Sequence, residues 1–370
     1  MSTPEDRGRY SDRYLALMGL APKRIPHWEH WSCPDAETYL TGIDYYEHPR
    51  QCRLRLRELY PQLELPIPES DEPIPRPDAA AEGHIEDEEG RRRVRWGDGT
   101  TWHWDWGRSF RDAEEALSFS PLANADFTHM PVVESRDYSD EGKLYEEYRA
   151  RFPAEWGDEP PDGSTAMVGF YNTMFMWPLL TFGWRLFLEI CLDERFARIM
   201  DEFAEINRRV FRVFARLPVR FVVCHDDIVT ARGPVCSPAW MRRYIFPRYE
   251  EFWGMLRAAG KRVIFMADGC LDAYVEDIFS CGASGIVTEP YTDFRRVAQR
   301  HPDCVLAGEG DNRILMRNDP EEIERMVRQM VQTAQMAAGY FMCIGNHIPW
   351  NTPPAAVKLY LDLSAELARR

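Results

Sequence analysis

Apolar and polar residues alternate in blocks along the chain, and the blocks predict strands and helices that follow one another. The clearest example is Arg262–Glu289, where a short apolar run, Val263–Phe265, stops near Asp268. A helical pattern with one apolar face follows, and a second apolar run, residues 285–288, ends at Glu289. A strand, an amphipathic helix and a strand within about thirty residues are typical of the βαβ unit of a parallel sheet.

The same alternation continues through the second half of the chain, where it repeats six times. Further strands are expected at 165–171, 218–225, 304–308 and 340–344, and helices at 175–191, 194–217, 237–259, 319–338 and from about 353. Residues 24–31 form a plausible first strand after a leader helix, and no G-x-G-x-x-G or Walker A motif occurs. The pattern predicts the α/β class. It favours one (β/α)8 TIM-barrel domain over residues 1–370, with an N-terminal helical extension.

Residues 65–110 are expected to be an insertion in this barrel. Its first part, 65–90, is rich in Pro, Asp and Glu and has the composition of a linker. The part that follows alternates in hydrophobicity, and Asp98-Gly99 predicts the turn of a β-hairpin. Trp102 and Trp104 lie along this hairpin. Its tryptophans either cover a face of the sheet or form an aromatic wall over a substrate, so both residues are candidate substrate contacts.

The bulk composition excludes some classes of partner. The net charge of −15 and the acidic isoelectric point of about 5.2 argue against nucleic acid or an anionic membrane, which need clustered Lys and Arg. No apolar run is long enough to cross a bilayer, and the N-terminus lacks the apolar core of a secretory signal. Nine cysteines without C-x-x-C spacing are typical of reduced thiols, so we expect a cytoplasmic protein.

Ionisable residues gather where the predicted strands end, which in an α/β barrel is where ligands bind. These residues are Asp226, Asp227, Asp268, Glu289, Glu309 and His347. Asp226-Asp227 could supply one raised pKa through like-charge repulsion, and Tyr171 could donate a hydrogen bond to a substrate oxygen. Strand alternation is expected to turn His225 away from the acidic pair. The structural alternative is that such carboxylates cap helices or pair with arginines, for example Asp226 with Arg232.

Four stretches in the second half, in matching order and spacing, resemble the uroporphyrinogen decarboxylase superfamily. They are DDIVTARGPVCSPAWMRRYIFPRYEEF (226–252), FMADG (265–269), GEGDNRILMRNDPEEI (308–323) and GNHIPWNTPPAAV (345–357). The superfamily includes porphyrinogen decarboxylases and methyltransferases that feed corrinoid proteins. The resemblance covers about residues 165–370, and it implies a TIM barrel with its active site in the C-terminal mouth. A dimer would be usual for the superfamily.

The chain also departs from the family patterns. Porphyrinogen decarboxylases carry an Arg-rich segment after the first strand, whereas this chain has HWEHW, which includes His30 and no Arg. Cationic anchors for a multiply negative porphyrinogen are therefore missing there. The thiol methyltransferases of the superfamily bind zinc through a His-x-Cys pair and a later Cys. The equivalent positions are Met266, Asp268 and Asn346.

The resemblance and the strand ends lead to three functional hypotheses. In the first, a methyltransferase binds zinc through Glu289, Glu309 and His347 and passes a methyl group from a small, possibly aromatic, methyl ether to a corrinoid protein. In the second, a metal-independent decarboxylase uses Asp227, Asp268 and His347 as acid–base groups. In the third, the barrel only binds a small molecule. Candidate substrate contacts outside the hairpin are His30, Tyr171, Asp226 and Asn346.

Overall fold

The structure, a computed structural model, describes residues 6–74, 76, 83–86, 92–96, 99–102, 110–130 and 134–369. The chain divides into two compact units. Unit 1 combines Met1–His103 with Val287–Arg370, and unit 2 is Trp104–Ile286. We describe each unit by itself.

The sheet of unit 2 contains three parallel strands, β6 (Met167–Phe170), β7 (Phe221–His225) and β10 (Arg262–Met266). β7 lies in the centre, with β6 paired to one edge and β10 to the other. Residues of β7 and β10 are largely buried apolar side chains, as expected for parallel strands covered on both faces. Because the three strands run in the same direction, the residues that follow them emerge at one end of the sheet.

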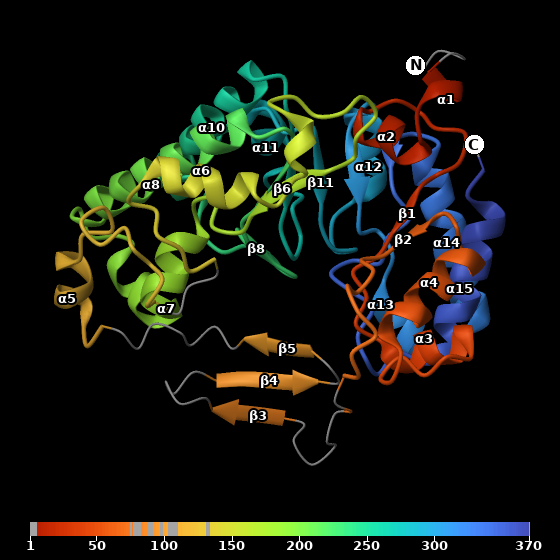
Figure 1. Ribbon diagram of the computed structural model, residues 1–370. Coiled ribbons are helices and arrows are strands. Elements are labelled where there is room, and N and C mark those ends of the chain that lie inside the picture. The colour runs from red at the N-terminus through yellow and green to blue at the C-terminus, as the bar shows by residue number, and fades with distance from the viewer. Residues whose placement is uncertain are drawn as a thin grey trace. The chain divides into compact units, whose positions relative to one another are not determined.

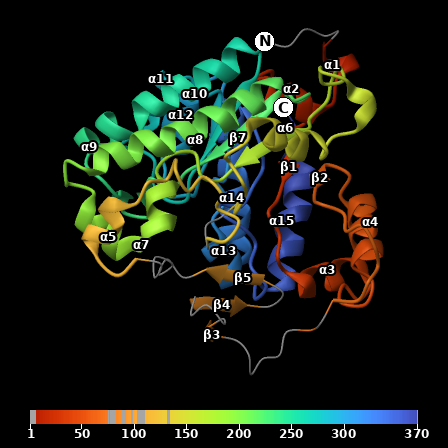
Figure 2. The ribbon, with the colours of Figure 1, turned by 60° about the vertical axis from the view of Figure 1, so that its left-hand side comes forward.

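Long amphipathic helices cover this sheet. Helix α8 (Phe196–Arg216) packs against α10 (Phe246–Ala258), and the two run side by side in Figures 1 and 2. The other helical elements of unit 2 are α5 (Ala113–Ser118), α6 (Glu141–Arg149), the 3-10 turn Ala154–Trp156, α7 (Met176–Ile190), α9 (Pro238–Tyr244) and α11 (Val275–Cys281). A short hairpin, β8 (Val229–Thr230) with β9 (Gly233–Pro234), follows β7.

Sequence signals place several helix ends of unit 2. Ser237 accepts a hydrogen bond from the N–H of Trp240 and caps α9. The expected single helix 237–259 is instead two helices that break at Ile245. Pro247 explains the break, because it lacks a backbone N–H and occupies the first turn of α10. Gly282 ends α11 in the left-handed conformation.

The strands of unit 1 are short. β1 (His27–Trp28) pairs in parallel with β2 (Leu63–Glu64), and β12 (Val305–Ala307) pairs in parallel with β13 (Gly339–Tyr340). Parallel bridges also join His27 to Met342 and Trp31 to Ile348, so the first predicted strand lies beside the last. β11 (Gly285–Val287) crosses the boundary between the two units.

Eight helices are described in unit 1. They are α1 (Asp6–Arg9), α2 (Asp12–Leu17), α3 (Pro34–Thr41), α4 (Pro49–Leu59), α12 (Phe294–Arg300), α13 (Asn312–Arg317), α14 (Pro320–Ala334) and α15 (Pro354–Leu367). Asp319 caps α14 through the N–H groups of Glu321 and Glu322, as its sequence predicts. α3 and α4 are separated by an irregular turn.

Glu29 connects three parts of unit 1. Its buried carboxylate accepts hydrogen bonds from the Tyr360 hydroxyl of α15 at 2.6 Å and from the Ile344 N–H at 3.1 Å. The Nε2 atom of His27 lies 2.7 Å from the same carboxylate. These contacts fix the first strand against the segment after β13, and so position the exposed residues that follow each of them.

The predicted β-hairpin is confirmed. β4 (Arg92–Trp96) and β5 (Gly99–Trp102) pair antiparallel, with Trp96 opposite Gly99, and β3 (Gly83–Glu86) adds a third strand. The side chain of Trp102 and the whole of Trp104 lie outside the described residues, so their predicted contact with substrate stays a prediction. The prediction of one domain with an insertion at 65–110 also stays a prediction.

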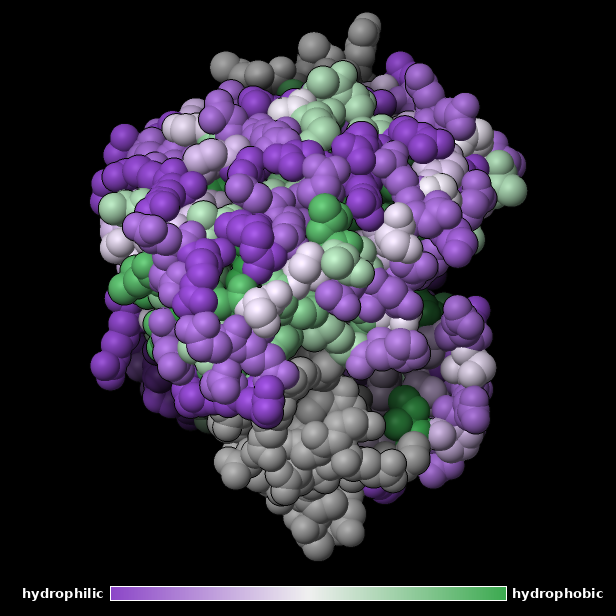
Figure 3. Space-filling view, turned by 90° about the vertical axis from the view of Figure 1, so that its left-hand side faces the viewer, coloured by the Kyte–Doolittle hydropathy of each residue, from purple (hydrophilic) through white to green (hydrophobic). Residues whose placement is uncertain are grey.

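The described surface is mainly hydrophilic on the face that Figure 3 shows, with smaller hydrophobic areas among the hydrophilic residues. Among the described residues, no helix combines the length and the apolar character needed to span a bilayer. Exposed large hydrophobic residues are few in this part of the chain, and Leu192, just after α7, is the most exposed at 83%.

Candidate functional site

Three ionisable side chains of unit 2 converge at the carboxyl ends of β7 and β10. His225 ends β7, Asp227 follows it by two residues, and Asp268 lies two residues beyond β10. One ligand atom from each of the three lies within 4.8 Å of the others. Among the described residues, this is the one group of three or more His, Cys, Asp or Glu side chains with the spacing of a metal site.

Asp227 is the centre of this trio. Its Oδ1 atom lies 3.0 Å from Nε2 of His225 and accepts a hydrogen bond of 3.0 Å from the N–H of Asp268. Its Oδ2 atom accepts a hydrogen bond of 3.2 Å from the hydroxyl of Tyr171, the residue that follows β6. The Tyr171 ring packs against His225 with ring centroids 4.1 Å apart. Residues from the ends of three adjacent parallel strands therefore form one polar cluster.

The charges of the cluster are coupled. Burial lowers the pKa of His225, but the hydrogen bond and the negative charge of Asp227, together with Asp268, outweigh burial and leave that pKa raised. Burial alone would raise the pKa of Asp227. His225 and the hydrogen-bond donors outweigh burial, so the pKa lies below its ordinary value. Burial and the nearby Asp227 raise the pKa of Tyr171, which keeps its hydroxyl protonated. Without a metal, both shifts favour a protonated His225 beside an ionised Asp227.

Asp226, the neighbour of Asp227, points the opposite way and has a structural role. It is fully buried, and its carboxylate accepts hydrogen bonds from the N–H groups of Met174, Phe175 and Met176 and from the Tyr249 hydroxyl. These N–H groups begin α7, where a carboxylate is favoured. Burial raises the pKa of Asp226 to about 7, against the effect of these donors. The prediction that Asp226 contacts a substrate is therefore corrected.

The expectation for His225 was also wrong, and the reason is strand alternation itself. Residues i and i+2 of an extended chain share a face, so His225 and Asp227 face the same side and Asp226 the other. The segment Cys224–Asp227 thus contained the signal for this pair. Whether the His225–Asp227 pair lies near Asp268 depends on which strands are neighbours in the sheet, and the local sequence pattern does not specify this.

In unit 1, the structure brings together three of the predicted residues. The His30 and His347 rings lie 5.8 Å apart, and the side chain of Asn346 hydrogen-bonds to Nδ1 of His347. Asn346 has a φ of 61°, a left-handed conformation that Asn tolerates. Burial and then the neighbouring His30 lower the pKa of His347 to about 4. His347 is therefore a neutral imidazole at neutral pH, which suits a base or a hydrogen-bond partner.

Glu309 and Glu289 lie in unit 1 after β12 and β11. The Glu309 carboxylate is buried and accepts hydrogen bonds from Tyr340 at 2.7 Å, Thr333 at 2.9 Å and Gln329 at 3.2 Å. Burial raises its pKa, although these three donors oppose that rise. Across the described residues, Glu289, Glu309 and His347 do not form a group with metal-ligand spacing.

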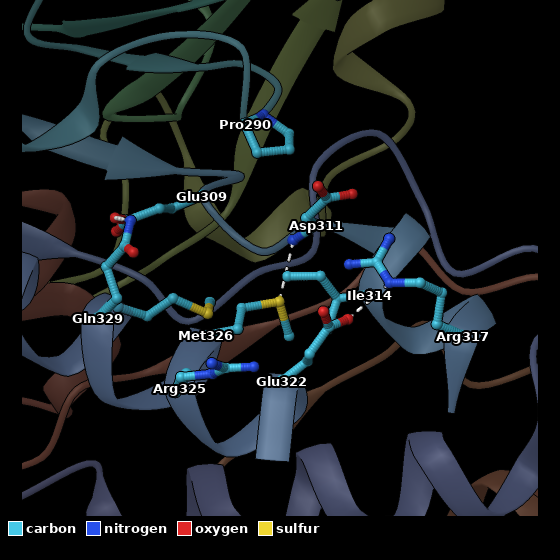
Figure 4. A pocket seen from close by; sticks show the side chains of 10 residues that line it. Pro290, Glu309, Asp311, Ile314, Arg317, Glu322, Arg325, Met326 and Gln329 are labelled. Atoms are coloured by element: carbon cyan, nitrogen blue, oxygen red, sulfur yellow. Dashed lines mark hydrogen bonds and ion pairs between the residues drawn. The ribbon is translucent and has the colours of Figure 1, made fainter. Parts of the chain in front are cut away.

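A cavity of about 420 Å³ adjoins Glu309, between the turns after β11 and β12 and the helices α13 and α14. Figure 4 shows Asp311 and Met326 on its walls, where the Asp311 N–H donates to the Met326 sulfur at 3.1 Å. Arg317 pairs with Glu322 at 2.6 Å at the same cavity. Asp311 also pairs with Arg313, at 2.8 Å. The cavity is mainly polar and has room for a small molecule.

Comparison with known proteins relates this fold to one family. The model of the uroporphyrinogen decarboxylase (URO-D) family matches residues 187–367. The uroporphyrinogen decarboxylase of Thermus thermophilus is 25% identical over 171 residues, which are 46% of this chain and 48% of that protein. The match therefore spans about half the length of that relative.

A solved structure extends the likeness to nearly the whole chain. A methyltransferase from Methanosarcina mazei matches with a TM-score of 0.55 and 13% identity, over 96% of this chain and 99% of its own. At this identity the likeness concerns the fold. It confirms the predicted α/β fold of the TIM-barrel type.

Proposed function

We propose that the chain is a divergent member of the uroporphyrinogen decarboxylase superfamily, whose family model matches residues 187–367, and that it is a metal-assisted methyltransferase. The observation that carries the proposal is the His225–Asp227–Asp268 trio at the carboxyl ends of parallel strands. The fold likeness to a methyltransferase supports the reaction type. In this proposal a small methyl ether donates its methyl group to a corrinoid carried by a partner protein.

The trio fits a zinc ion chemically. One imidazole nitrogen and two carboxylate oxygens are ligands that zinc accepts, and three protein ligands leave a position open, as in catalytic zinc sites. The proton on His225 supplies the main positive charge beside Asp227. A bound metal cation would take the place of that proton. This site replaces the predicted one on Glu289, Glu309 and His347, whose side chains lack such spacing.

Bound there, zinc would supply Lewis acidity for the oxygen that loses its methyl group. The chain itself contributes Tyr171, whose protonated hydroxyl donates to Asp227 and would turn from it to donate instead to the same oxygen. The ether C–O bond would break with its electron pair left on oxygen, and the reduced corrinoid of the partner would supply the electron pair that accepts the methyl group. The buried Asp227 and the half-buried His225 orient each other through their 3.0 Å contact.

Metal content tests this proposal directly. We expect near-stoichiometric zinc in the purified protein and its loss in Asp227→Asn and Asp268→Asn. Glu289→Gln and Glu309→Gln are matched controls, because both are strand-end carboxylates outside the trio. If zinc is retained in Asp268→Asn and lost in Glu289→Gln, the metal binds at the site predicted from the sequence and not at the trio.

A second function is favoured by the coupled charges of His225 and Asp227. A protonated His225 beside a carboxylate could deliver a proton to the carbanion left by decarboxylation, without a metal. This alternative predicts carbon dioxide release that a chelator does not reduce. Methylation of free cob(I)alamin that requires zinc would instead support methyl transfer.

A further inference from the structure

A second cavity, in unit 2, has a volume of about 650 Å³. It lies at the amino ends of β7 and β10, whereas the His225–Asp227–Asp268 trio lies at their carboxyl ends. Its walls come from the residues just before β7 and β10, the end of α8 and a loop that follows α6. Its charged and titratable lining groups are Tyr145, Asp158, Glu159, Arg216, Arg220 and Lys261. Neither the sequence patterns nor the proposed reaction uses these residues.

The three cations of this cavity lack carboxylate partners. No Asp or Glu of the described chain lies within ion-pair distance of Arg216, Arg220 or Lys261, whereas Arg212, one turn earlier on α8, pairs with Glu141 at 2.9 Å. Arg216 instead packs over the Tyr145 ring, with Cζ 4.2 Å from its centroid. That packing orients the guanidinium but leaves its charge uncompensated.

Lys261 is the most unusual of the three because only 7% of it is exposed. Its Nζ atom donates to the carbonyls of Leu217 at 2.7 Å and Val219 at 2.6 Å. An ammonium group has three N–H donors, so one is left for the cavity. Burial and then the charge of Arg220 lower the pKa of Lys261 to about 8. A buried cation that lacks a counterion favours the binding of an anion.

We propose that this cavity binds a small oxyanion, the phosphate or carboxylate group of a metabolite, through Lys261, Arg220 and Arg216. Guanidinium groups suit such planar or tetrahedral oxyanions, and Lys261 adds a point charge. Asp158 and Glu159 also line the cavity and oppose an anion, but both are exposed and their charges are screened by water and salt. The net charge of the lining groups at neutral pH remains positive.

Titration calorimetry of the full chain at pH 7, with inorganic phosphate in one series and succinate in another, tests the proposal and separates the two oxyanions. We expect saturable binding of at least one of them, and at least a tenfold loss of affinity in Arg220→Gln and Lys261→Met. Arg212→Gln is the matched control on α8, and Arg325→Gln reports on the unit 1 cavity; neither should change the affinity. Absence of saturable binding, or an equal loss in either control, would overturn the proposal.

A pH series with sulfate, whose charge is constant, tests the part played by Lys261. Affinity in the wild type should fall at least threefold between pH 7 and 9, as Lys261 loses its proton near pH 8. Lys261→Met should bind weakly and show no such fall. Equal pH dependence in the two proteins would contradict the proposal. If Lys261→Met does not fold, Arg220→Gln tests the site, because its side chain is only half-buried.

Discussion

The adjacent residues Asp226 and Asp227 have different roles, and substitution of each residue distinguishes the two roles. In Asp226→Asn, an amide would face three backbone N–H groups and the Tyr249 hydroxyl, so a buried donor would meet donors. We expect the free energy of unfolding to fall by roughly 3 kcal/mol, since an unsatisfied buried group near a charged one costs about 1–3 kcal/mol. Urea unfolding measures this loss, while zinc content should be unchanged in the folded fraction.

Asp227→Asn should show the reverse behaviour. The free energy of unfolding should change by only about 1 kcal/mol, because the amide oxygen can still accept the Asp268 N–H and the amide nitrogen can donate to the Tyr171 hydroxyl oxygen. Zinc should be lost, because a carboxylate ligand is removed. A stable Asp227→Asn protein with full zinc, or loss of zinc in Asp226→Asn with little loss of stability, would show that the two roles had been exchanged.

His347 should make unit 1 sensitive to acid. Its folded pKa, about 4, is below its ordinary value of about 6.5, so the unfolded chain binds more protons between these pH values. The free energy of unfolding should therefore rise with pH from 4 to 6.5 and stay constant above. The side chain is partly exposed, which reduces the effect to about 1–2 kcal/mol.

Thermal unfolding of wild type and His347→Gln across this pH range measures the contribution of His347. The dependence on pH should be shallower in His347→Gln, while His129→Gln, a change at an exposed histidine, should leave it unaltered. His30 has a lowered pKa through its own burial and contributes in the same direction. An identical slope in wild type and His347→Gln would mean that His347 does not titrate in this way.

At the scale of elements, the turn after β10 is constrained by one glycine. Gly269 has a φ of +117°, and a Cβ atom there would lie 2.5 Å from the Thr230 carbonyl carbon of β8. Gly269→Ala should lower the free energy of unfolding by about 2 kcal/mol or more and weaken zinc binding by moving Asp268. Gly254→Ala, within α10 and with open space around it, should be neutral or stabilising by up to about 1 kcal/mol. Equal stability of the two variants would contradict this reading of the turn.

Long helices were predictable because their signals are local. The expected helices 175–191 and 194–217 correspond within two residues to α7 and α8. The apolar face of α8 repeats over more than four turns, whereas α7 is kinked at Gly183, which has a φ of 73°. The strands of unit 1 were harder, since β13 has two residues and most of the predicted strand 340–344 is joined to its neighbours by isolated bridges. Short strands depend on tertiary pairing, which a local pattern does not contain.

The candidate site was predictable only in part, for the same reason. The strand-end rule selected Asp227, Asp268 and Tyr171 from the sequence, and the structure brings them together. It also selected Glu309, whose carboxylate accepts hydrogen bonds from Tyr340, Thr333 and Gln329 in the structure. Whether a strand-end carboxylate faces a ligand or a helix depends on side-chain direction and on the packed helices, and both are properties of the folded unit.

For the whole molecule, zinc binding and stability are coupled. A ligand that binds the folded chain and not the unfolded chain adds about 2.7 kcal/mol at a hundred times its Kd. We expect the chelated protein to unfold at a temperature lower by a few degrees, and zinc to restore the difference. Asp268→Asn should show no response to zinc. A response of equal size in that variant would place the metal elsewhere.

The location of this stabilisation in the chain distinguishes the two metal sites. Because His225, Asp227 and Asp268 follow β7 and β10, added zinc should slow amide hydrogen exchange in those strands and in the turn at Gly269. Peptides around Glu289, Glu309 and His347 should exchange at the same rate with and without zinc. Slower exchange there, with none in β7 and β10, would show that the metal binds the residues expected from the sequence. Decarboxylation through His225 would then become the stronger proposal for unit 2, since its imidazolium would have no metal to displace its proton.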